Sequence, residues 1–212
     1  MCFNDKASMA TFLIGLVGSL LLIKYGNPKY KTENSIFGIF LIFIAGIQLM
    51  DFLFWIDIKN KLGINHITTL IGPLFNVGQP VILYAIKLIY FTPTIYTMKE
   101  MNLPVALLNA GYCVYLALMY SNFLSAGKLV TSTSHGHLDW PWLKYTNNLF
   151  YLIMFAINIF YLTDFKYSLI FFAVTYFFLY LSAKYFFYSA GELWCFFGAF
   201  IPAIILLIFH II

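Results

Sequence analysis

Charged side chains are scarce in this sequence. Only 9% of its 212 residues are Asp, Glu, Lys or Arg, whereas 62% are hydrophobic. A soluble domain would be about half apolar and a quarter charged, and at this size much of its surface would still face water. The composition therefore excludes an ordinary soluble domain and favours a chain that folds in a lipid bilayer. The lipid bilayer is thus the expected partner of this protein.

Arginine is absent, since every one of the 12 basic residues is Lys. Bidentate recognition of phosphate and carboxylate groups mostly uses Arg, and the formal charge of +4 is spread thinly along the chain. We therefore expect no nucleic-acid partner. Cysteine is also scarce: Cys2, Cys113 and Cys195 have no spacing typical of a disulfide framework or a zinc motif.

Long apolar segments are what the sequence does contain. They lack the apolar/polar alternation of membrane β-strands and are about twice as long as such strands. A helix satisfies its own backbone polar groups in lipid. The sequence thus predicts a single all-α domain over residues 1–212, an integral membrane bundle of about seven transmembrane helices. The expected segments are 7–23, 35–56, 67–91, 103–123, 143–162, 167–187 and 193–212.

Seven crossings would put the N-terminus on one face of the membrane, here face A, and the C-terminus on the other, face B. The lysines divide equally between the faces, so the positive-inside rule gives little guidance. The first connection carries more Lys than the N-terminal tail, which slightly favours face B as cytoplasmic. No small-residue cleavage site follows the first segment, which we expect to be a retained helix and not a signal peptide. Which membrane holds the protein is left open.

Tyr and Trp residues lie near the ends of the segments. Amphipathic aromatic rings of this kind are typical of the interfacial belts of membrane proteins. We therefore expect a belt that includes Trp55, Tyr90, Trp140, Trp142 and Trp194.

Polar side chains inside the apolar segments mark the candidate site, because they are costly in lipid unless they have a role. Gln48, Asp51 and Trp55 stand at i, i+3 and i+7, which places them on one helix face. Two amide residues come shortly before Pro80, which frees a backbone carbonyl. Chain direction predicts a polar pocket in the face-A half of the bundle, formed by Gln48, Asp51, Trp55, Asn76, Gln79 and Glu192.

The remaining polar groups have simpler expected roles. Asn109, Asn147 and Asn158 are expected to hydrogen-bond between helices. Lys184, near the end of a segment, is expected to extend its ammonium group to the interface. No internal repeat of the kind found in many secondary transporters is evident.

Three functions of different classes fit such a pocket. The first is handling of an ion or a small polar solute by a transporter or channel, with Asp51 and Glu192 as acidic groups. The second is a membrane-embedded enzyme or metal-binding protein; a metal ion is the one cofactor that the residues suggest. The third is a membrane scaffold, in which the polar groups only hold helices together. Speculative metal ligands are Cys2, His135, His137 and Cys195. Whether the protein is an enzyme, and whether it forms a homo-oligomer, is left open.

The N-terminus Met1-Cys2-Phe3-Asn4-Asp5-Lys6-Ala7-Ser8 resembles a family of small polytopic membrane proteins from bacteria, algae and large DNA viruses. Members of that family begin Met-Cys-Phe-Ser, and Ala-Ser follows shortly. The Gln48-x-x-Asp51-x-x-x-Trp55 helix, the Leu193-Trp194-Cys195-Phe196-Phe197 run and His137 are also similar. This sequence departs by having Asn4 where Ser is usual. The resemblance implies a fold and no activity.

The resemblance also draws attention to Cys2. Removal of Met1 would leave a free amine and thiol there, a pair that can bind a metal or act as a nucleophile once deprotonated. Acylation of the thiol is the alternative. We expect Cys2 to fold back against Asp51, Glu192 and Cys195.

Overall fold

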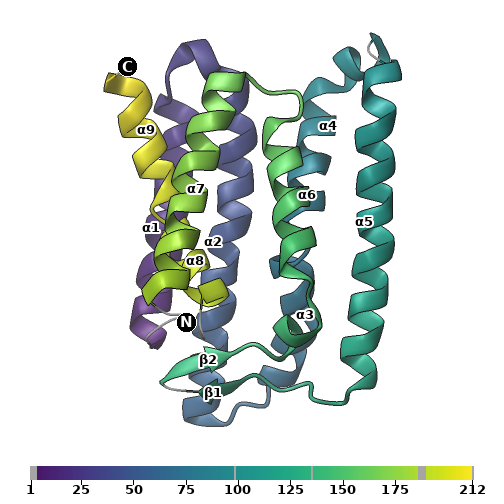
Figure 1. The fold of residues 1–212 in the computed structure, drawn as a ribbon. Helices are drawn as coiled ribbons and strands as arrows, with labels where there is room; N and C mark the ends of the chain where they lie inside the picture. Colours follow the sequence, from purple (N-terminus) through teal and green to yellow (C-terminus); the bar gives the residue numbers. More distant parts are fainter. Residues whose placement is uncertain (1–3, 98, 135, 186–189, 212) are drawn as a thin grey trace.

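Long helices run side by side between the two ends of the molecule, and a small hairpin lies at one end (Figure 1). The computed structural model describes residues 4–97, 99–134, 136–185 and 190–211. Strands β1 (Ser132–Ser134) and β2 (His137–Asp139) pair antiparallel to form the hairpin. The α-helices are α1 (Asp5–Tyr25), α2 (Lys31–Asn60), α3 (Asn65–Asn76), α4 (Gln79–Thr97), α5 (Lys99–Ser125), α6 (Asn148–Phe160), α7 (Phe165–Tyr185), α8 (Ala190–Gly198) and α9 (Ile201–Ile211), and the short 3-10 helices are η1 (Pro28–Tyr30) and η2 (Pro141–Tyr145).

The all-α class expected from the sequence is confirmed, and each expected segment contains a helix or a helix pair. Five described helical stretches are long and apolar enough to cross a membrane: Asp5–Tyr25, Pro28–Asn60, Asn102–Ser125, Phe165–Tyr185 and Leu193–His210. Helices α3 and α4 form a sixth candidate, a pair bent by 59°. Helix α6 has only 13 residues, so the segment expected over 143–162 is not one full-length helix.

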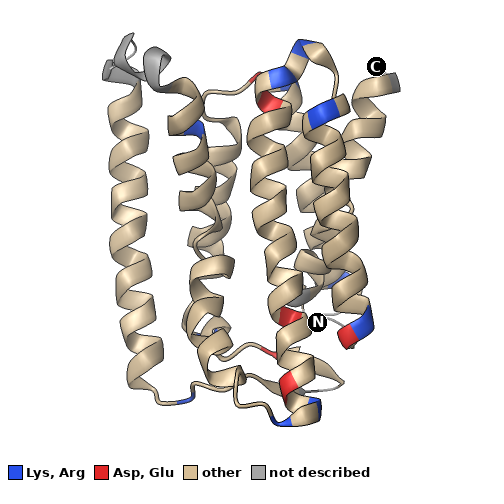
Figure 2. Ribbon diagram, turned by 180° about the vertical axis from the view of Figure 1, so that it is seen from behind, with Lys and Arg blue, Asp and Glu red and all other residues tan. Residues whose placement is uncertain are grey.

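The hairpin lies at the same end of the bundle as the N-terminus, and the C-terminus lies at the opposite end (Figure 1). We keep the name face A for the first end and face B for the second. Charged residues gather toward these two ends, with long stretches of helix between them that carry none (Figure 2). Apolar middles with charged ends are the pattern expected of helices that cross a bilayer.

Helix α2 is the centre of the bundle. It contacts α1, α3, α4, α8 and α9, and 61% of its most apolar stretch is buried, against 17% for α5. Small residues allow α1 to approach both α2 and the α8–α9 break closely: a Cβ atom on Gly15 would lie 3.0 Å from the Cβ of Ala45 and 3.3 Å from the Cα of Ala199. Close backbone approach at small residues is typical of helix packing in membranes.

The break between α3 and α4 falls at Val77 and Gly78, and α4 begins at Gln79. Pro80 is the second residue of α4, where its missing N–H has no helical partner to lose. The Tyr112 hydroxyl donates a 2.9 Å hydrogen bond to the carbonyl oxygen of Val77. A second break separates α8 from α9, and Pro202 again occupies the second position of the new helix. At the α3–α4 break, a neighbouring side chain thus satisfies a carbonyl at the interruption.

Helix α6 is held at both ends by side chains. The Asn147 side chain caps its N-terminus by accepting a hydrogen bond from the N–H of Phe150. At its C-terminus lies Lys87 of α4, which is fully buried. Its ammonium group donates to the hydroxyl of Thr163 and to the carbonyl oxygens of Asn158, Ile159 and Tyr161. A cation at a helix C-terminus satisfies carbonyls that have no helical partner.

Replacing Lys87 by Met should destabilise the bundle by roughly 3 kcal/mol, because several buried carbonyl groups lose a charged donor. The apparent melting temperature in detergent, followed by tryptophan fluorescence, measures this effect. Lys166→Met is the matched control, since Lys166 is exposed in the first turn of α7. Equal melting temperatures for the two variants would contradict the capping role.

Candidate functional site

Asp51 of α2 is fully buried in the face-A half of the bundle. Its Oδ1 atom accepts a 3.1 Å hydrogen bond from the indole N–H of Trp140. Trp140 and Trp142 are each 1% exposed, and their rings stack with centroids 5.2 Å apart. We call these two residues the Trp wedge. The expectation that they belong to an interfacial belt is wrong, because the connection between α5 and α6 buries them among the helices.

The second ring of the Trp wedge rests on α3 at Gly72. A Cβ atom there would lie 2.3 Å from the Cη2 atom of Trp142, so only glycine leaves room for the ring. The indole N–H of Trp142 donates to Oδ1 of Asn76 at 3.4 Å. The Trp wedge therefore connects Asp51 on α2 to the last residue of α3, beside the helix break.

The connection that carries the Trp wedge is also fixed to α3 on its other side. Asn65 donates to the carbonyl oxygen of Thr131 at 2.8 Å, and its own Oδ1 accepts from the Thr131 N–H at 2.8 Å. The hydroxyl groups of Thr69 and Thr131 lie 2.9 Å apart. These contacts give the loop a defined position across the face-A end of the bundle.

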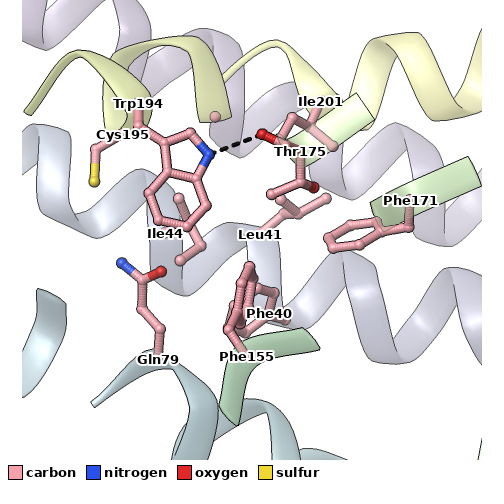
Figure 3. A pocket seen from close by; sticks show the side chains of 11 residues that line it. Phe40, Leu41, Ile44, Gln79, Phe155, Phe171, Thr175, Trp194, Cys195 and Ile201 are labelled. Carbon is pink, nitrogen blue, oxygen red and sulfur yellow. Dashed lines mark hydrogen bonds between the residues drawn. The ribbon is translucent and has the colours of Figure 1, made fainter. Parts of the chain in front are cut away.

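Polar side chains around the α3–α4 break meet residues of α6 and α8. The Asn76 amide donates to the Cys195 sulfur at 3.9 Å, and the Tyr151 hydroxyl donates to Oε1 of Gln79 at 2.6 Å. Figure 3 shows the Gln79 amide and the Cys195 thiol on facing sides of the same small space. Hydrogen bonds and one ring stack thus link Asp51 to Tyr151 through the Trp wedge and the break.

A cavity of about 440 Å³ adjoins this network, and we call it the outer cavity. It lies between the α3–α4 break, the start of α6, and helices α7 and α8. Asn148 and Ala183 on its border are exposed, whereas Tyr151 and Trp194 at its inner wall are buried. Its lining residues are Asn76, Val77, Leu143, Thr146, Asn148, Tyr151, Leu152, Leu179, Ala183, Ala190, Gly191 and Trp194.

A much smaller space of about 20 Å³ lies behind Trp194, and we call it the inner chamber (Figure 3). Trp194 lines both spaces, with its ring held by a 3.0 Å hydrogen bond from its indole N–H to the carbonyl oxygen of Thr175. Trp194 is therefore also buried, not part of an interfacial belt. The inner chamber is lined by Phe40, Leu41, Ile44, Gln79, Phe155, Phe171, Thr175, Trp194, Cys195, Gly198 and Ile201.

The pocket residues expected from the sequence separate into groups. Asp51, Asn76 and Gln79 belong to the network described above. Gln48 is buried, but its Oε1 accepts from the Thr11 hydroxyl at 3.0 Å and so ties α2 to α1. Trp55 is half-buried and packs against the hydrophobic core. The side chain of Glu192, in the first turn of α8, lies outside the described residues.

The speculative metal ligands are only partly described. Cys2 and His135 lie outside the described residues, so the expected folding back of Cys2 is not tested. His137 lies on β2 and Cys195 is buried on α8. Within the described part of the chain, no group of three or more His, Cys, Asp or Glu side chains could hold a metal ion.

Several residues of the site were not found from the sequence. Tyr151 and Thr175 are ordinary residues for a membrane helix, and nothing in their spacing sets them apart. The run Trp140-Pro141-Trp142 is more distinctive, because two tryptophans flank the proline at which the loop enters the 3-10 helix η2. The interhelical role expected for Asn109 and Asn158 is seen, since each amide donates to the other, at 3.1 and 2.9 Å.

Replacing Gly72 by Ala should displace Trp142 and cost about 1–3 kcal/mol of stability, the usual range for overpacking a core. The apparent melting temperature in detergent tests this expectation. Gly111→Ala on α5 is the matched control, since a Cβ atom there meets nothing within 4 Å and helix propensity favours Ala. A Gly72→Ala protein as stable as the Gly111→Ala protein would show that the Trp wedge is not closely packed.

Comparisons with known proteins add no identity to this geometry. No protein-family model, no curated protein and no solved structure matches the chain. The resemblance to the family that begins Met-Cys-Phe-Ser therefore stays a prediction, and the function has to be inferred from the site itself.

Proposed function

We propose that this protein crosses a membrane seven times and lets a small uncharged polar solute pass by way of the outer cavity. The five long apolar stretches and the bent α3–α4 pair supply six of the proposed crossings. The seventh would consist of η2 and α6, residues 141–160. At about 1.5–2 Å per residue, this stretch is of the order of the 30 Å hydrocarbon thickness.

The observation that carries the proposal is the position of the α3–α4 break. Asn76 and Val77, at the break, both line the outer cavity. In lipid, non-helical backbone is tolerated only where it is buried in protein or borders a water-filled space. Helices interrupted at a central site are also typical of secondary transporters, whose binding sites use the freed backbone groups.

The lining of the outer cavity supports a solute without net charge. It offers the amides of Asn76 and Asn148 and the hydroxyls of Thr146 and Tyr151, set among leucine and valine side chains. No Asp, Glu, Lys or Arg occurs among its lining residues in the described part of the chain. Pockets that are mostly apolar with a few converging polar groups commonly bind small organic molecules, and about 300–1,000 Å³ is their usual volume.

The ion-handling alternative is less well supported. Asp51 lines neither the outer cavity nor the inner chamber. Its Oδ1 instead accepts a hydrogen bond from the Trp wedge. A cation route would need the Trp wedge to leave Asp51, whereas an uncharged solute can use the outer cavity as it is.

Blocking the outer cavity should stop solute passage. We would replace Ala183, at its exposed border on α7, with Trp and measure glycerol and urea entry into proteoliposomes by stopped-flow light scattering. Permeability above that of protein-free liposomes should be lost in Ala183→Trp, because the indole ring fills the entrance.

Ala117→Trp is the control, since Ala117 is also exposed but lies on α5, away from the outer cavity. It should leave permeability unchanged. Wild-type protein that admits neither solute, or two variants that behave alike, would contradict the proposal. The metal-site alternative is tested separately by elemental analysis of the tag-free protein, and the scaffold alternative remains if both tests are negative.

A further inference from the structure

The outer cavity opens toward face A. Its exposed border residues are Asn148, the first residue of α6, and Ala183, in the last turn of α7. Both of these helix ends lie at the face-A end of the bundle (Figure 1). A solute that enters from face A therefore meets Tyr151 and Trp194 at the inner wall of the cavity.

The inner chamber lies one helical turn closer to face B than the outer cavity. On α6, which runs toward face B, the lining passes from Leu152 of the outer cavity to Phe155 of the inner chamber. On α7, which runs toward face A, Leu179 lines the outer cavity and Thr175 lines the inner chamber. Trp194 lines both. The two spaces thus follow each other through the bundle and share the Trp194 side chain as a wall.

Three aromatic rings are packed against one another at this wall. The rings of Tyr151 and Phe155 stack with centroids 6.0 Å apart, and the Trp194 ring meets both edge-on, at 5.9 and 5.8 Å. Such edge-to-face pairs are favourable contacts between aromatic side chains. None of the three residues is more than 8% exposed. We call Tyr151, Phe155 and Trp194 the ring cluster.

The space on the face-B side of the ring cluster is too small for a solute. The inner chamber measures about 20 Å³, and roughly 10–15 Å³ is what a single water molecule needs. Beyond it, the ring of Phe171, which lines the chamber, packs on the ring of Phe37 with centroids 4.1 Å apart. The structure is therefore open to a solute from face A and closed toward face B.

Trp194 differs from the other two rings in the element that carries it. The Tyr151 hydroxyl is bonded to Gln79, and the Phe155 ring also packs against Phe40, with centroids 5.7 Å apart. Both residues belong to the continuous helix α6. Trp194 instead lies on α8, which has nine residues and ends at the break before α9. Hinge motions use the ends of elements in this way.

We infer that the ring cluster is a gate that closes the outer cavity toward face B, and that Trp194 is the ring that moves when a solute passes. Constrictions lined by apolar side chains can close a pore by excluding water. The inference rests on the proposed function, because the bundle needs a gate at this depth only if a solute crosses it.

A cysteine on the far side of the ring cluster reports whether the gate is closed. Leu41 of α2 is 2% exposed and lines only the inner chamber, whereas Leu152 lines only the outer cavity. Each would be replaced by Cys in a chain whose Cys2, Cys113 and Cys195 are Ser, reconstituted in lipid and treated with a charged, membrane-impermeant thiol reagent. We expect the Leu41→Cys protein to react several-fold more slowly than the Leu152→Cys protein.

Removal of the indole ring should open the gate. Adding Trp194→Ala to the Leu41→Cys protein should raise its reaction rate several-fold, because the two spaces lose the wall that they share. Trp194→Phe keeps a ring and should raise the rate much less. Met119→Ala is the control, since Met119 is a buried residue of α5 that lines neither space, and it should leave the rate unchanged.

Equal rates for the Leu41→Cys and Leu152→Cys proteins with Trp194 in place would overturn the inference, even if Trp194→Ala failed to fold. An unchanged rate in a folded Trp194→Ala protein would also overturn it, as would an equal increase in the Met119→Ala protein. A Leu152→Cys protein that does not react at all would instead show a dry outer cavity. That result would contradict the proposed function, and the gate with it.

Discussion

The hydrogen bond from the Trp140 indole N–H to the Asp51 carboxyl group holds the connection between α5 and α6 inside the bundle. Through it the Trp wedge stays buried, and Trp142 can lie on Gly72 and donate to Asn76 at the end of α3. Asn76 stands at the helix break and lines the outer cavity. An ionisable side chain inside an apolar membrane helix costs free energy unless it has a partner or a function. Here the carboxylate binds the element that shapes the candidate site, which is why Asp51 is central without lining the cavity.

Backbone groups left over at two helix ends in this fold are satisfied by side chains from other helices. Tyr112 satisfies the Val77 carbonyl at the α3–α4 break, and Lys87 satisfies the last carbonyls of α6. The two helix ends differ in their surroundings. The α3–α4 break borders a large cavity, whereas the Lys87 ammonium is enclosed among the carbonyl groups that it caps. At the α3–α4 break, the outer cavity thus combines free volume with polar groups.

The sequence predicted the helical class and the approximate limits of the apolar segments, because lipid imposes long continuous apolar runs. It also singled out Asp51, Asn76 and Gln79, because polar residues in such runs need a reason. It failed for the tryptophans: Trp is amphipathic, and composition cannot show whether a loop turns outward to the interface or inward to the core. The role of Lys87 gave no signal in the sequence, because the carbonyls that it binds belong to a helix far along the chain. Thr175 gave no signal, because the partners of a hydroxyl depend on packing.

The central claim is that the outer cavity is a water-accessible space within a bundle otherwise surrounded by lipid. Two adjacent residues of α6 test it directly: Leu152 lines the outer cavity and is half-buried, whereas Ile153 points outward and is 48% exposed. Each would be replaced by Cys in a chain whose Cys2 and Cys113 are Ser, reconstituted in lipid and treated with a charged, membrane-impermeant thiol reagent. The account predicts that the cysteine at position 152 reacts and that the more exposed one at position 153 does not. Faster reaction at position 153 would mean that this face meets water, and it would contradict both the membrane setting and the role of the outer cavity.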